Sequence, residues 1–316
     1  MTPPRIALII PCFNEEVTIA GVVNDFRRVL PQARIVVFDN NSTDGTAKAA
    51  RAAGAEVRHE FQQGKGHVVR RAFADIDADF YFMVDGDGTY DASSAPAMLR
   101  LLVDEHLDMV TAARLAGTDA YRPGHAVGNR VLTRLVRAAF GGRMTDMLSG
   151  YRVFSRRFVK SFPAMAKGFE IETELVIHAL DLCMPVGEIS SAYSGRSAGS
   201  VSKLRTVRDG SRVFLTIALL IKEERPFQLF SCLAVLFLLA GASAGLPVVW
   251  EFWDTGLVLR LPTAVLAAGL MLLSFLSISC GLILDSVARA RKEQLRLVYL
   301  SYSENDDCHQ YMNSTE

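Results

Sequence analysis

The stretch DFYFMVDGDGTYD, residues 79–91, joins a short apolar run to a pair of carboxylates. An apolar run of this length, bounded by polar residues and glycine, is typical of a buried β-strand. Asp85 and Asp87 follow at the carboxyl end of the run, and Gly86 between them lets the backbone turn closely. Two hard oxygen ligands at this spacing suit Mg²⁺ or Mn²⁺ that is held jointly with a diphosphate. The stretch therefore predicts a strand that ends at a metal site.

Further apolar runs on both sides of this strand indicate the fold class. The runs RIALII, RIVVFD, AEVRHE and DMVTAAR alternate with helical patterns over about residues 15–30 and 43–53, after Gly66, and up to about residue 105. This alternation predicts an α/β fold with a mostly parallel sheet that is covered by helices on both faces. Ligands of such open sheets bind beyond the carboxyl ends of the strands. Side chains that carry chemistry should therefore follow the apolar runs.

Polar segments do follow the first and second strands, as PCFNE (11–15) and DNNSTD (39–44). Asp39 closes an apolar strand, where its carboxylate can accept a hydrogen bond from a nucleobase edge; a turn or helix-capping role is the alternative. Ser42 and Thr43 are expected to cap the following helix. The chain has neither GxGxxG after the first strand nor GxxxxGK[ST], so neither a dinucleotide fingerprint nor a P-loop is predicted.

A short basic segment and a later polar cluster add candidate site residues. Lys65, in Gly-Lys-Gly, opens a helix and can meet a phosphate at its N-terminus, while a solvated loop lysine is the alternative. The later cluster comprises Asp146, Ser149 and Arg152 in DMLSGYR with Glu172 and Glu174 in FEIETE. Residues two apart on a helix do not share a face, so only one of the two glutamates should reach the site. Two roles are open for this cluster: its side chains support the loops, or they contact the sugar directly.

Composition limits the class of protein. The 316 residues correspond to about two domains. The 34 basic and 34 acidic residues balance, so no net field draws the chain to nucleic acid, and no nucleic-acid partner is expected. The five cysteines lack CxxC or Cys/His spacing, so neither a zinc site nor a disulfide framework is predicted. The first apolar run is too short for a signal peptide.

Two uncharged stretches predict membrane spans. Residues 227–250 and 263–284 contain no charged side chain, and as helices they are about 33 to 36 Å long, enough for a hydrocarbon core of about 30 Å. Two buried helices of a soluble core are the alternative. Residues 207–226 carry apolar side chains at helical spacing among basic ones, which predicts an interfacial amphipathic helix. An ordinary amphipathic helix packed on the soluble domain is the alternative there.

Basic residues flank both spans and predict their orientation. Lys and Arg are frequent before the first span and after the second, while the link Glu251–Pro262 has one basic residue. The positive-inside rule then makes the domain of residues 1–206 and the tail 285–316 cytoplasmic, in a multi-pass protein of the inner (cytoplasmic) membrane. Gly241 and Gly245 form a GxxxG motif, which can pair two chains in a homo-oligomer or two helices of one hairpin.

The chain carries seven motifs in order: PCFNEE, VVFDNNSTDGT, GKGHVVR, MVDGDGTYD, DMLSGYRVFSRR, GFEIETEL and GSVSKLRTVRDG. Together they resemble the family 2 glycosyltransferases of the dolichol-phosphate mannose synthase type. The resemblance is closest to the bacterial polyprenyl-phosphate glycosyltransferases that end in two membrane helices. It covers about residues 5–225 and implies a GT-A-like form of the α/β fold.

The resemblance also implies roles for individual residues. Around the nucleoside of a nucleotide-sugar it places Pro11, Phe13, Glu15 and Asp39. At the metal and the donor phosphates it places Asp85 and Asp87, and the phosphate contact expected of Lys65 at its helix N-terminus would add to them. Near the acceptor phosphate it places Arg114, Arg196, Ser202 and Lys203, and it counts Asp85, Asp87, Arg114 and Arg196 as catalytic. Phe13 stands where tyrosine is usual, and Thr89 stands where glutamine is usual, which leaves the third metal ligand open.

The reaction that the resemblance implies is transfer of a hexose from a nucleotide-sugar to polyprenyl phosphate at the membrane, with inversion. UDP-glucose is the first choice of donor by resemblance, GDP-mannose the second, and UDP-N-acetylglucosamine a third. A phosphate monoester is largely dianionic at about pH 7, so the acceptor is itself a nucleophile and needs no strong protein base. The alternatives are a polysaccharide or protein acceptor, nucleotidyl transfer, and a non-enzymatic membrane scaffold.

Overall fold

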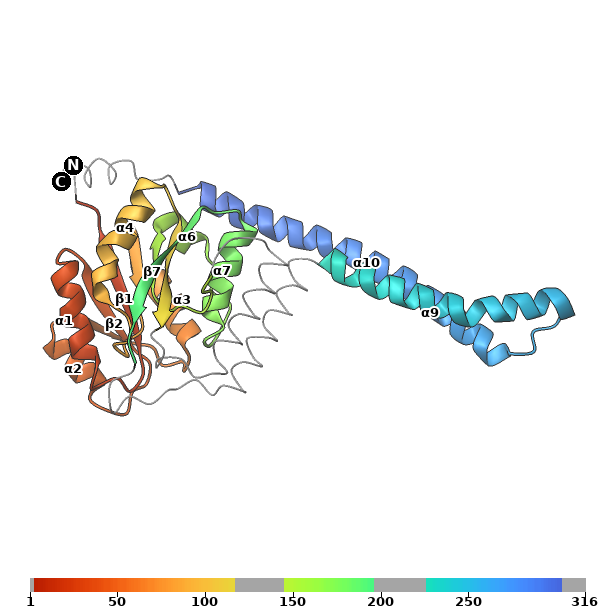
Figure 1. The fold of residues 1–316 in the computed structure, drawn as a ribbon, viewed down its shortest axis with the longest axis horizontal. Helices are drawn as coiled ribbons and strands as arrows, with labels where there is room; N and C mark the ends of the chain where they lie inside the picture. The colour runs from red at the N-terminus through yellow and green to blue at the C-terminus, as the bar shows by residue number, and fades with distance from the viewer. Residues whose placement is uncertain (1–2, 117–144, 196–225, 303–316) are drawn as a thin grey trace. The chain divides into compact units, whose positions relative to one another are not determined.

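The computed structural model describes residues 3–116, 145–195 and 226–302 (Figure 1). The chain divides into two compact units, residues 1–216 with 295–316 and residues 217–294. Arg196, Ser202 and Lys203 lie outside the described residues, as does the expected interfacial helix up to residue 225. Within the described residues, the first unit is an α/β domain and the second is a helical hairpin.

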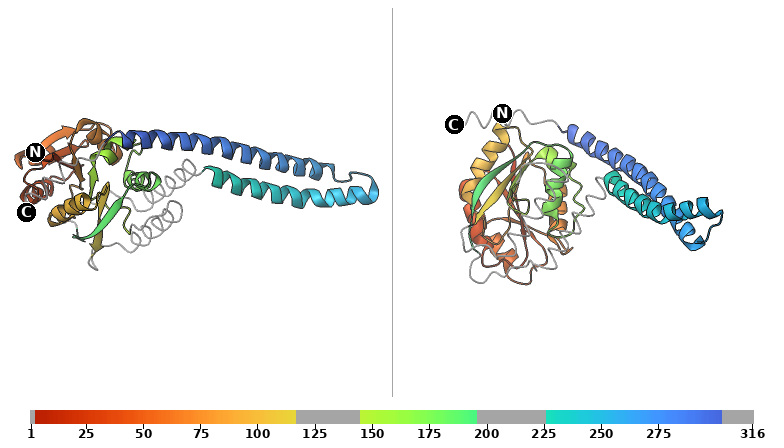
Figure 2. Two further views of the ribbon diagram at one scale, coloured as in Figure 1. Left: turned by 90° about the horizontal axis from the view of Figure 1, so that it is seen from above. Right: turned by 45° about the vertical axis from the view of Figure 1, so that its right-hand side comes forward.

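The α/β unit is built on a seven-stranded sheet with the order β3-β2-β1-β4-β6-β5-β7 (Figures 1 and 2). Its strands are β1 Ile6–Cys12, β2 Arg34–Asp39, β3 Glu56–His59, β4 Phe80–Met83, β5 Met109–Ala116, β6 Arg152–Ser155 and β7 Val186–Tyr193. Among these seven strands only β6 runs antiparallel to its neighbours, and every other pair is parallel. The expected mostly parallel sheet is therefore confirmed.

Helices cover both faces of this sheet. They are α1 Ile19–Val29, α2 Thr46–Ala52, α3 Lys65–Asp75, η1 Ala92–Ser94 (a 3₁₀ turn), α4 Ala95–Asp104, α6 Arg156–Ser161 and α7 Ile171–Asp181. Figure 1 shows α1 and α4 on one face and α3 and α7 on the other, and each of these pairs is in contact. Leu8, Ile9 and Ile10 are each 0% exposed, as expected for a central strand that is covered on both faces.

Two helices begin later than the sequence suggests. The first begins at Ile19 instead of about residue 15, because the preceding residues form a turn closed by the Thr18 N–H on the Glu15 carbonyl. The second begins at Thr46 instead of about residue 43. The expectation that Ser42 caps this helix is wrong, because Ser42 Oγ instead accepts a hydrogen bond from the Asn14 N–H at 3.0 Å. Thr43 is likewise no cap, since the N-cap residue is Gly45 and Thr43 Oγ1 donates to Asn14 Oδ1 at 3.3 Å.

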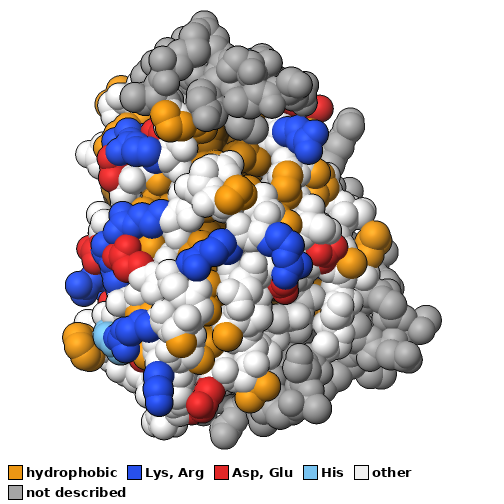
Figure 3. All heavy atoms as spheres, turned by 90° about the vertical axis from the view of Figure 1, so that its left-hand side faces the viewer, with side chains coloured by type: hydrophobic (Ala, Val, Ile, Leu, Met, Phe, Trp, Pro, Cys, Tyr) orange, Lys and Arg blue, Asp and Glu red, His pale blue; other side chains and the backbone are white. Residues whose placement is uncertain are grey.

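The surface of the α/β unit has charges of both signs. On the face drawn in Figure 3, basic side chains lie among acidic ones. Ion pairs on β2, β3 and α3 have the same character, for example Arg34 with Glu56 and Arg71 with Asp75. Such mixing on this face fits the balanced composition.

The second unit contains a pair of long apolar helices. Helix α9 spans Pro226–Thr255 and α10 spans Leu261–Leu300, so both extend past the expected spans of 227–250 and 263–284. Both are long and apolar enough to cross a membrane, and only 17% and 22% of their most apolar windows are buried. The low burial argues against the soluble-core alternative. Two candidate spans form a hairpin, so the term multi-pass overstates what the described residues contain.

Small residues join the two helices of the hairpin. A side-chain carbon on Gly241 would lie 3.2 Å from Leu270 Cβ, and one on Gly245 would lie 3.3 Å from Ala267 Cβ. Ser274 Oγ also donates to the Ala234 carbonyl at 2.8 Å across the same interface. The GxxxG motif therefore faces α10 of the same chain, which removes it as a ground for expecting a homo-oligomer.

Candidate active site

The loops after β1 and β2 are tied together at the carboxyl edge of the sheet. Asn14 has a left-handed backbone, with φ of 52°, and its Oδ1 accepts from the Thr43 N–H at 2.8 Å. The Glu15 N–H donates to Thr46 Oγ1 at 2.8 Å. Pro11, Phe13 and Glu15 are all half-buried along this loop. The segment that follows the first strand is thus held beside the end of the second, as the topology of an open α/β sheet requires.

Asp39 ends β2, and one of its two carboxylate oxygens has no hydrogen-bond partner in the described part of the chain. Its side chain is buried, and its Oδ2 accepts a hydrogen bond from His59 Nδ1 at 3.1 Å. Its Oδ1 is also buried and accepts no hydrogen bond from any group among the described residues. Leaving a buried acceptor without a partner costs about 1–3 kcal/mol, more for a charged group, so such atoms are rare in the absence of a role. The carboxylate is therefore suited to a ligand N–H donor.

Asp85 and Asp87 lie just beyond β4, the strand that pairs with β1 on the side away from β2. Asp87 is buried, and its Oδ1 accepts from Thr89 Oγ1 at 2.7 Å and from the Thr89 N–H at 3.3 Å. The hydroxyl of Thr18 donates to the Gly86 carbonyl at 2.7 Å and fixes the turn between the two carboxylates. Thr89, at the position where glutamine is usual in the family that the sequence resembles, thus holds Asp87 in place.

Lys65 lies beside Asp85 and is buried. Its Nζ donates to Asp85 Oδ1 and, at 2.6 Å, to Glu172 Oε1. Burial lowers the pKa of Lys65, but the charges of Asp85 and Glu172 more than offset this, so the pKa lies above its ordinary 10.5. Burial also raises the pKa of Glu172. The structure thus excludes the solvated loop lysine and places a buried positive charge beside Asp85 and Glu172.

The two glutamates of α7 point to different partners, as their spacing predicts. Glu172 binds Lys65, whereas Glu174 accepts the N–H groups of Met165 and Ala166 at 2.9 and 2.7 Å. The loop that Glu174 holds packs against the start of α3, because a side-chain carbon on Gly66 would lie 2.1 Å from the Ala166 carbonyl oxygen. Glu174 therefore supports a loop, and Glu172 reaches the site.

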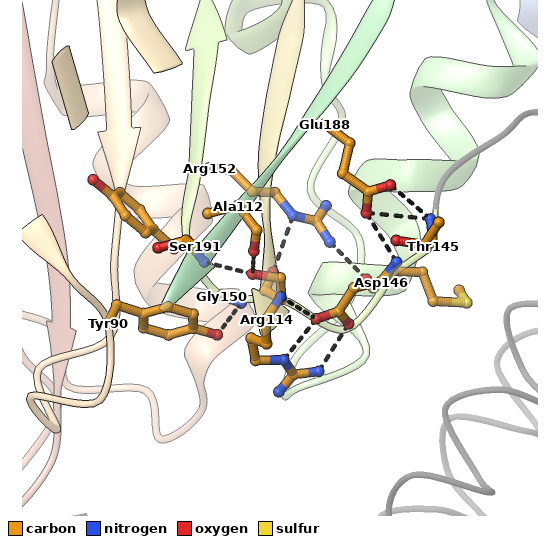
Figure 4. A network of polar contacts seen from close by, with 12 residues as sticks. Tyr90, Ala112, Arg114, Thr145, Asp146, Gly150, Arg152, Glu188 and Ser191 are labelled. Atoms are coloured by element: carbon orange, nitrogen blue, oxygen red, sulfur yellow. Dashed lines mark hydrogen bonds and ion pairs between the residues drawn. The ribbon is translucent and has the colours of Figure 1, made fainter. Parts of the chain in front are cut away.

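Arg114 at the end of β5 forms a fork with Asp146 (Figure 4). Its Nε and Nη2 donate to the two Asp146 oxygens at 2.7 and 2.8 Å, and its guanidinium lies 5.5 Å from the centre of the Tyr193 ring. Glu188 Oε1 accepts the Asp146 N–H at 3.0 Å and anchors that loop. Bidentate arginine–carboxylate pairs have well-defined geometry. Arg114 is therefore held in one direction.

Arg152 is fully buried and organises the loop before β6. Its guanidinium donates to the carbonyls of Ser149, Met147 and Glu172 at 3.0, 2.6 and 3.1 Å. Burial lowers the pKa of Arg152. Ser149 Oγ donates to the Ala112 carbonyl at 2.6 Å. These two members of the DMLSGYR cluster support backbone, which matches the first of the two expected readings.

Gly150 brings this loop against the carboxylate pair. A side-chain carbon at this position would lie 2.3 Å from Asp85 Oδ2. The Gly150 N–H donates to the Tyr90 hydroxyl at 2.7 Å (Figure 4). Burial raises the pKa of Tyr90 well above its ordinary value, so this phenol stays neutral. Neither His59 nor Gly150 was predicted from sequence, because their partners come from other strands and loops.

Known proteins share this sequence pattern and this fold. The family model described as "Glycosyl transferase family 2" matches residues 7–162. Glycosyltransferase AglJ of Haloferax volcanii is 32% identical over 303 residues, which cover 94% of this chain and 98% of that protein. Dolichyl-phosphate hexose transferase of the same organism is 26% identical over 221 residues, covering 70% of this chain and 95% of that protein.

Solved structures show the same fold at lower identity. Glucosyl-3-phosphoglycerate synthase from Mycobacterium tuberculosis, crystallised with Mn²⁺, UDP-glucose and phosphoglyceric acid, matches with a TM-score of 0.57. The identity is 22%, and the match covers 69% of this chain and 80% of that one.

Proposed function

This chain belongs to glycosyl transferase family 2, and from that premise we propose that it transfers a hexose from a nucleotide-sugar to a polyprenyl phosphate, with inversion at the anomeric carbon. The observation that carries the proposal is the cluster at the carboxyl edge of the sheet. There, the buried ammonium of Lys65 binds the carboxylate of Asp85, Asp87 follows two residues later, and Asp39 has an oxygen that is unpartnered within the described residues. Such a cluster suits a base joined to a diphosphate.

In the donor half, Pro11, Phe13, Glu15 and Asp39 would surround the nucleoside. Lys65 would meet the diphosphate, because it is a cation that is fixed beside Asp85. UDP-glucose is the first choice of donor and GDP-mannose the second, both by resemblance. A related fold crystallised with UDP-glucose supports a nucleotide-sugar of this kind.

Asp85 and Asp87 would hold the divalent metal, Mg²⁺ or Mn²⁺. Their donor set fits, since both are carboxylates with hard oxygen atoms and Mg²⁺ commonly takes only one or two carboxylates together with waters and substrate phosphates. Among the described residues no group of three or more His, Cys, Asp or Glu side chains is placed to hold a metal ion. When bound, the metal stabilises negative charge on the departing diphosphate.

In the acceptor half, Arg114 would bind the lipid phosphate together with Arg196, Ser202 and Lys203. The Asp146 fork fixes the direction of the Arg114 guanidinium before any ligand binds. An oxygen of the acceptor phosphate attacks the anomeric carbon, the bond from that carbon to the diphosphate oxygen breaks, and the nucleoside diphosphate leaves. The acceptor dianion carries no proton on the attacking oxygen, so no protein base is required.

The membrane hairpin would bring the enzyme to its lipid. A polyprenyl tail stays in the bilayer, so an acceptor of this kind calls for a membrane-bound enzyme. The two long apolar helices support such a location, and the name of one relative, dolichyl-phosphate hexose transferase, is that of an enzyme for a lipid phosphate. We further propose that the membrane is the inner (cytoplasmic) one and that both termini are cytoplasmic.

The test is a transfer assay on the full chain in detergent. The protein is incubated with Mn²⁺, a panel of nucleotide-sugars and undecaprenyl phosphate, and the lipid product is identified by its mass. We expect a hexosyl-phosphate lipid and release of a nucleoside diphosphate. Arg196→Ala and Lys203→Ala should depress transfer strongly at subsaturating acceptor while leaving donor affinity nearly unchanged. Transfer only to a polysaccharide or protein, or release of pyrophosphate, would overturn the proposal.

A further inference from the structure

The contacts around Asp39 distinguish its two carboxylate oxygens. In the parallel register of β2 and β3, Asp39 lies directly beside His59. His59 Nδ1 is 3.1 Å from Asp39 Oδ2, and His59 Nε2 is 3.1 Å from Arg51 Nη2. Asp39 Oδ1 is buried and receives no hydrogen bond from the described residues.

The donors in this chain determine which ring nitrogen of His59 carries hydrogen. A guanidinium only donates, so His59 Nε2 accepts from Arg51 and carries no hydrogen of its own. The hydrogen of the neutral ring then lies on Nδ1, which donates to Asp39 Oδ2. Arg51, His59 and Asp39 thus form a directed chain of hydrogen bonds that ends on one carboxylate oxygen. The other oxygen is left as the acceptor for a ligand.

We propose that His59 is a specificity-determining residue that makes the nucleotide pocket selective for a base with a single ring N–H donor, namely uracil. Uracil presents one N–H between two carbonyls, which matches one available acceptor. Guanine presents two adjacent donors, its ring N–H and its amino group, and would need both carboxylate oxygens on one side. Cytosine and adenine present an unprotonated ring nitrogen, whose lone pair would face the carboxylate.

This inference rests on the proposed function, because it assumes that Asp39 meets the base of a nucleotide donor. It goes beyond it, because it assigns a role to a residue of β3 that does not itself contact the donor in the argument above. Specificity of this kind has two parts: Asp39 Oδ1 accepts the N–H of uracil, and Asp39 Oδ2, which is already bonded to His59, is withheld from the second donor of guanine. His59 therefore acts as a positioning residue through Asp39.

The experiment measures binding of UDP, CDP, GDP and ADP to the full chain in detergent with Mn²⁺, by isothermal titration. These ligands share the diphosphate, so differences report the base. The wild type should bind UDP at least about tenfold more tightly than GDP, the effect of one charge-assisted hydrogen bond. His59→Phe should bring that ratio below about threefold. His59→Asn should restore it, because its side-chain amide keeps a donor near the Nδ1 position.

His67→Phe is the matched control, since His67 also pairs through a ring nitrogen with an arginine, Arg70, but contacts no carboxylate in the described structure. It should keep the preference for UDP. If the folded wild type binds GDP as tightly as UDP, or if His59→Phe keeps the full preference, the inference is wrong and the proposed function stands. If the folded wild type binds none of the four, the proposed donor site is wrong and the inference falls with it.

Discussion

Gly150→Ala tests whether the loop before β6 sets the position of a metal-binding carboxylate. A side-chain carbon at residue 150 would lie 2.3 Å from Asp85 Oδ2 and 3.0 Å from Lys65 Nζ. Ordinary contact begins near 3.4 Å, so the carboxylate must move by about 1 Å to relieve the overlap. Lys65 must move with it, because its ammonium is bonded to both Asp85 and Glu172. The substitution therefore disturbs the proposed metal and diphosphate site directly.

The expected size of the effect follows from this displacement. A misplacement of about 1 Å in an active site costs about 100-fold in rate, which corresponds to about 2.7 kcal/mol of transition-state stabilisation. Overpacking of this kind costs about 1–3 kcal/mol of the free energy of unfolding, which a folded domain can survive. We therefore expect kcat/KM for sugar transfer to fall by about 100-fold and the apparent Mn²⁺ affinity, titrated in the presence of UDP, to fall in a protein that still folds.

The matched control is Gly21→Ala. Gly21 lies within α1, and nothing lies within 4 Å of its added side-chain carbon. This variant should keep full activity and gain up to about 1 kcal/mol of stability, because alanine favours the helix more than glycine does. The reasoning is refuted if Gly150→Ala folds and keeps both its Mn²⁺ affinity and its kcat/KM within about threefold of the wild type.

Three further predictions concern the metal, a buried acid and the hairpin. Asp87→Asn should lower turnover by about three orders of magnitude, and EDTA should abolish wild-type activity until Mn²⁺ is restored. Burial raises the pKa of Glu172 in the folded protein above its ordinary 4.5, so as pH rises the side chain loses its proton in the unfolded chain before it does so in the folded one. The stability of the wild type relative to Glu172→Gln, measured by thermal unfolding, should therefore fall as pH rises above 4.5. An impermeant thiol reagent should label Thr255→Cys, in the link Glu251–Pro262, in intact cells. The metal prediction is contradicted by full activity in excess EDTA. The Glu172 prediction is contradicted if the wild type gains stability relative to Glu172→Gln as pH rises, and the topology prediction if Cys308 is labelled and residue 255 is not.

Local sequence was sufficient for the first five strands, since apolar runs and their polar ends are properties of neighbouring residues, but it did not predict β6 and β7. The sequence also predicted that Lys65 and Asp85 both face the phosphates of the donor. The Lys65–Glu172 ion pair was beyond it, because these residues are 107 positions apart and only tertiary packing joins them. The start of α2 was misjudged for the same reason: the Ser42 and Thr43 groups that would cap this helix instead bond to Asn14, in another loop.

His59 shows how register limits such predictions. The run that contains it was expected to be a strand, and it is. The pairing of His59 with Asp39 depends on the register between β2 and β3, which the short and partly polar third strand does not specify by itself. The chemical consequence, one occupied and one unoccupied carboxylate oxygen, becomes visible only when that register is known.

The reversed direction of β6 explains why the loop before it serves the site. In a parallel strand the preceding loop would lie at the opposite edge from Asp85. Because β6 runs antiparallel to β4 and β5, Arg152 pairs with Met83 at the carboxyl end of β4, so the residues before Arg152 lie at the site edge. This single reversal brings Gly150 to Asp85 and Asp146 to Arg114. One loop therefore supports both the proposed donor carboxylate and the proposed acceptor arginine, so its rigidity should affect both substrates.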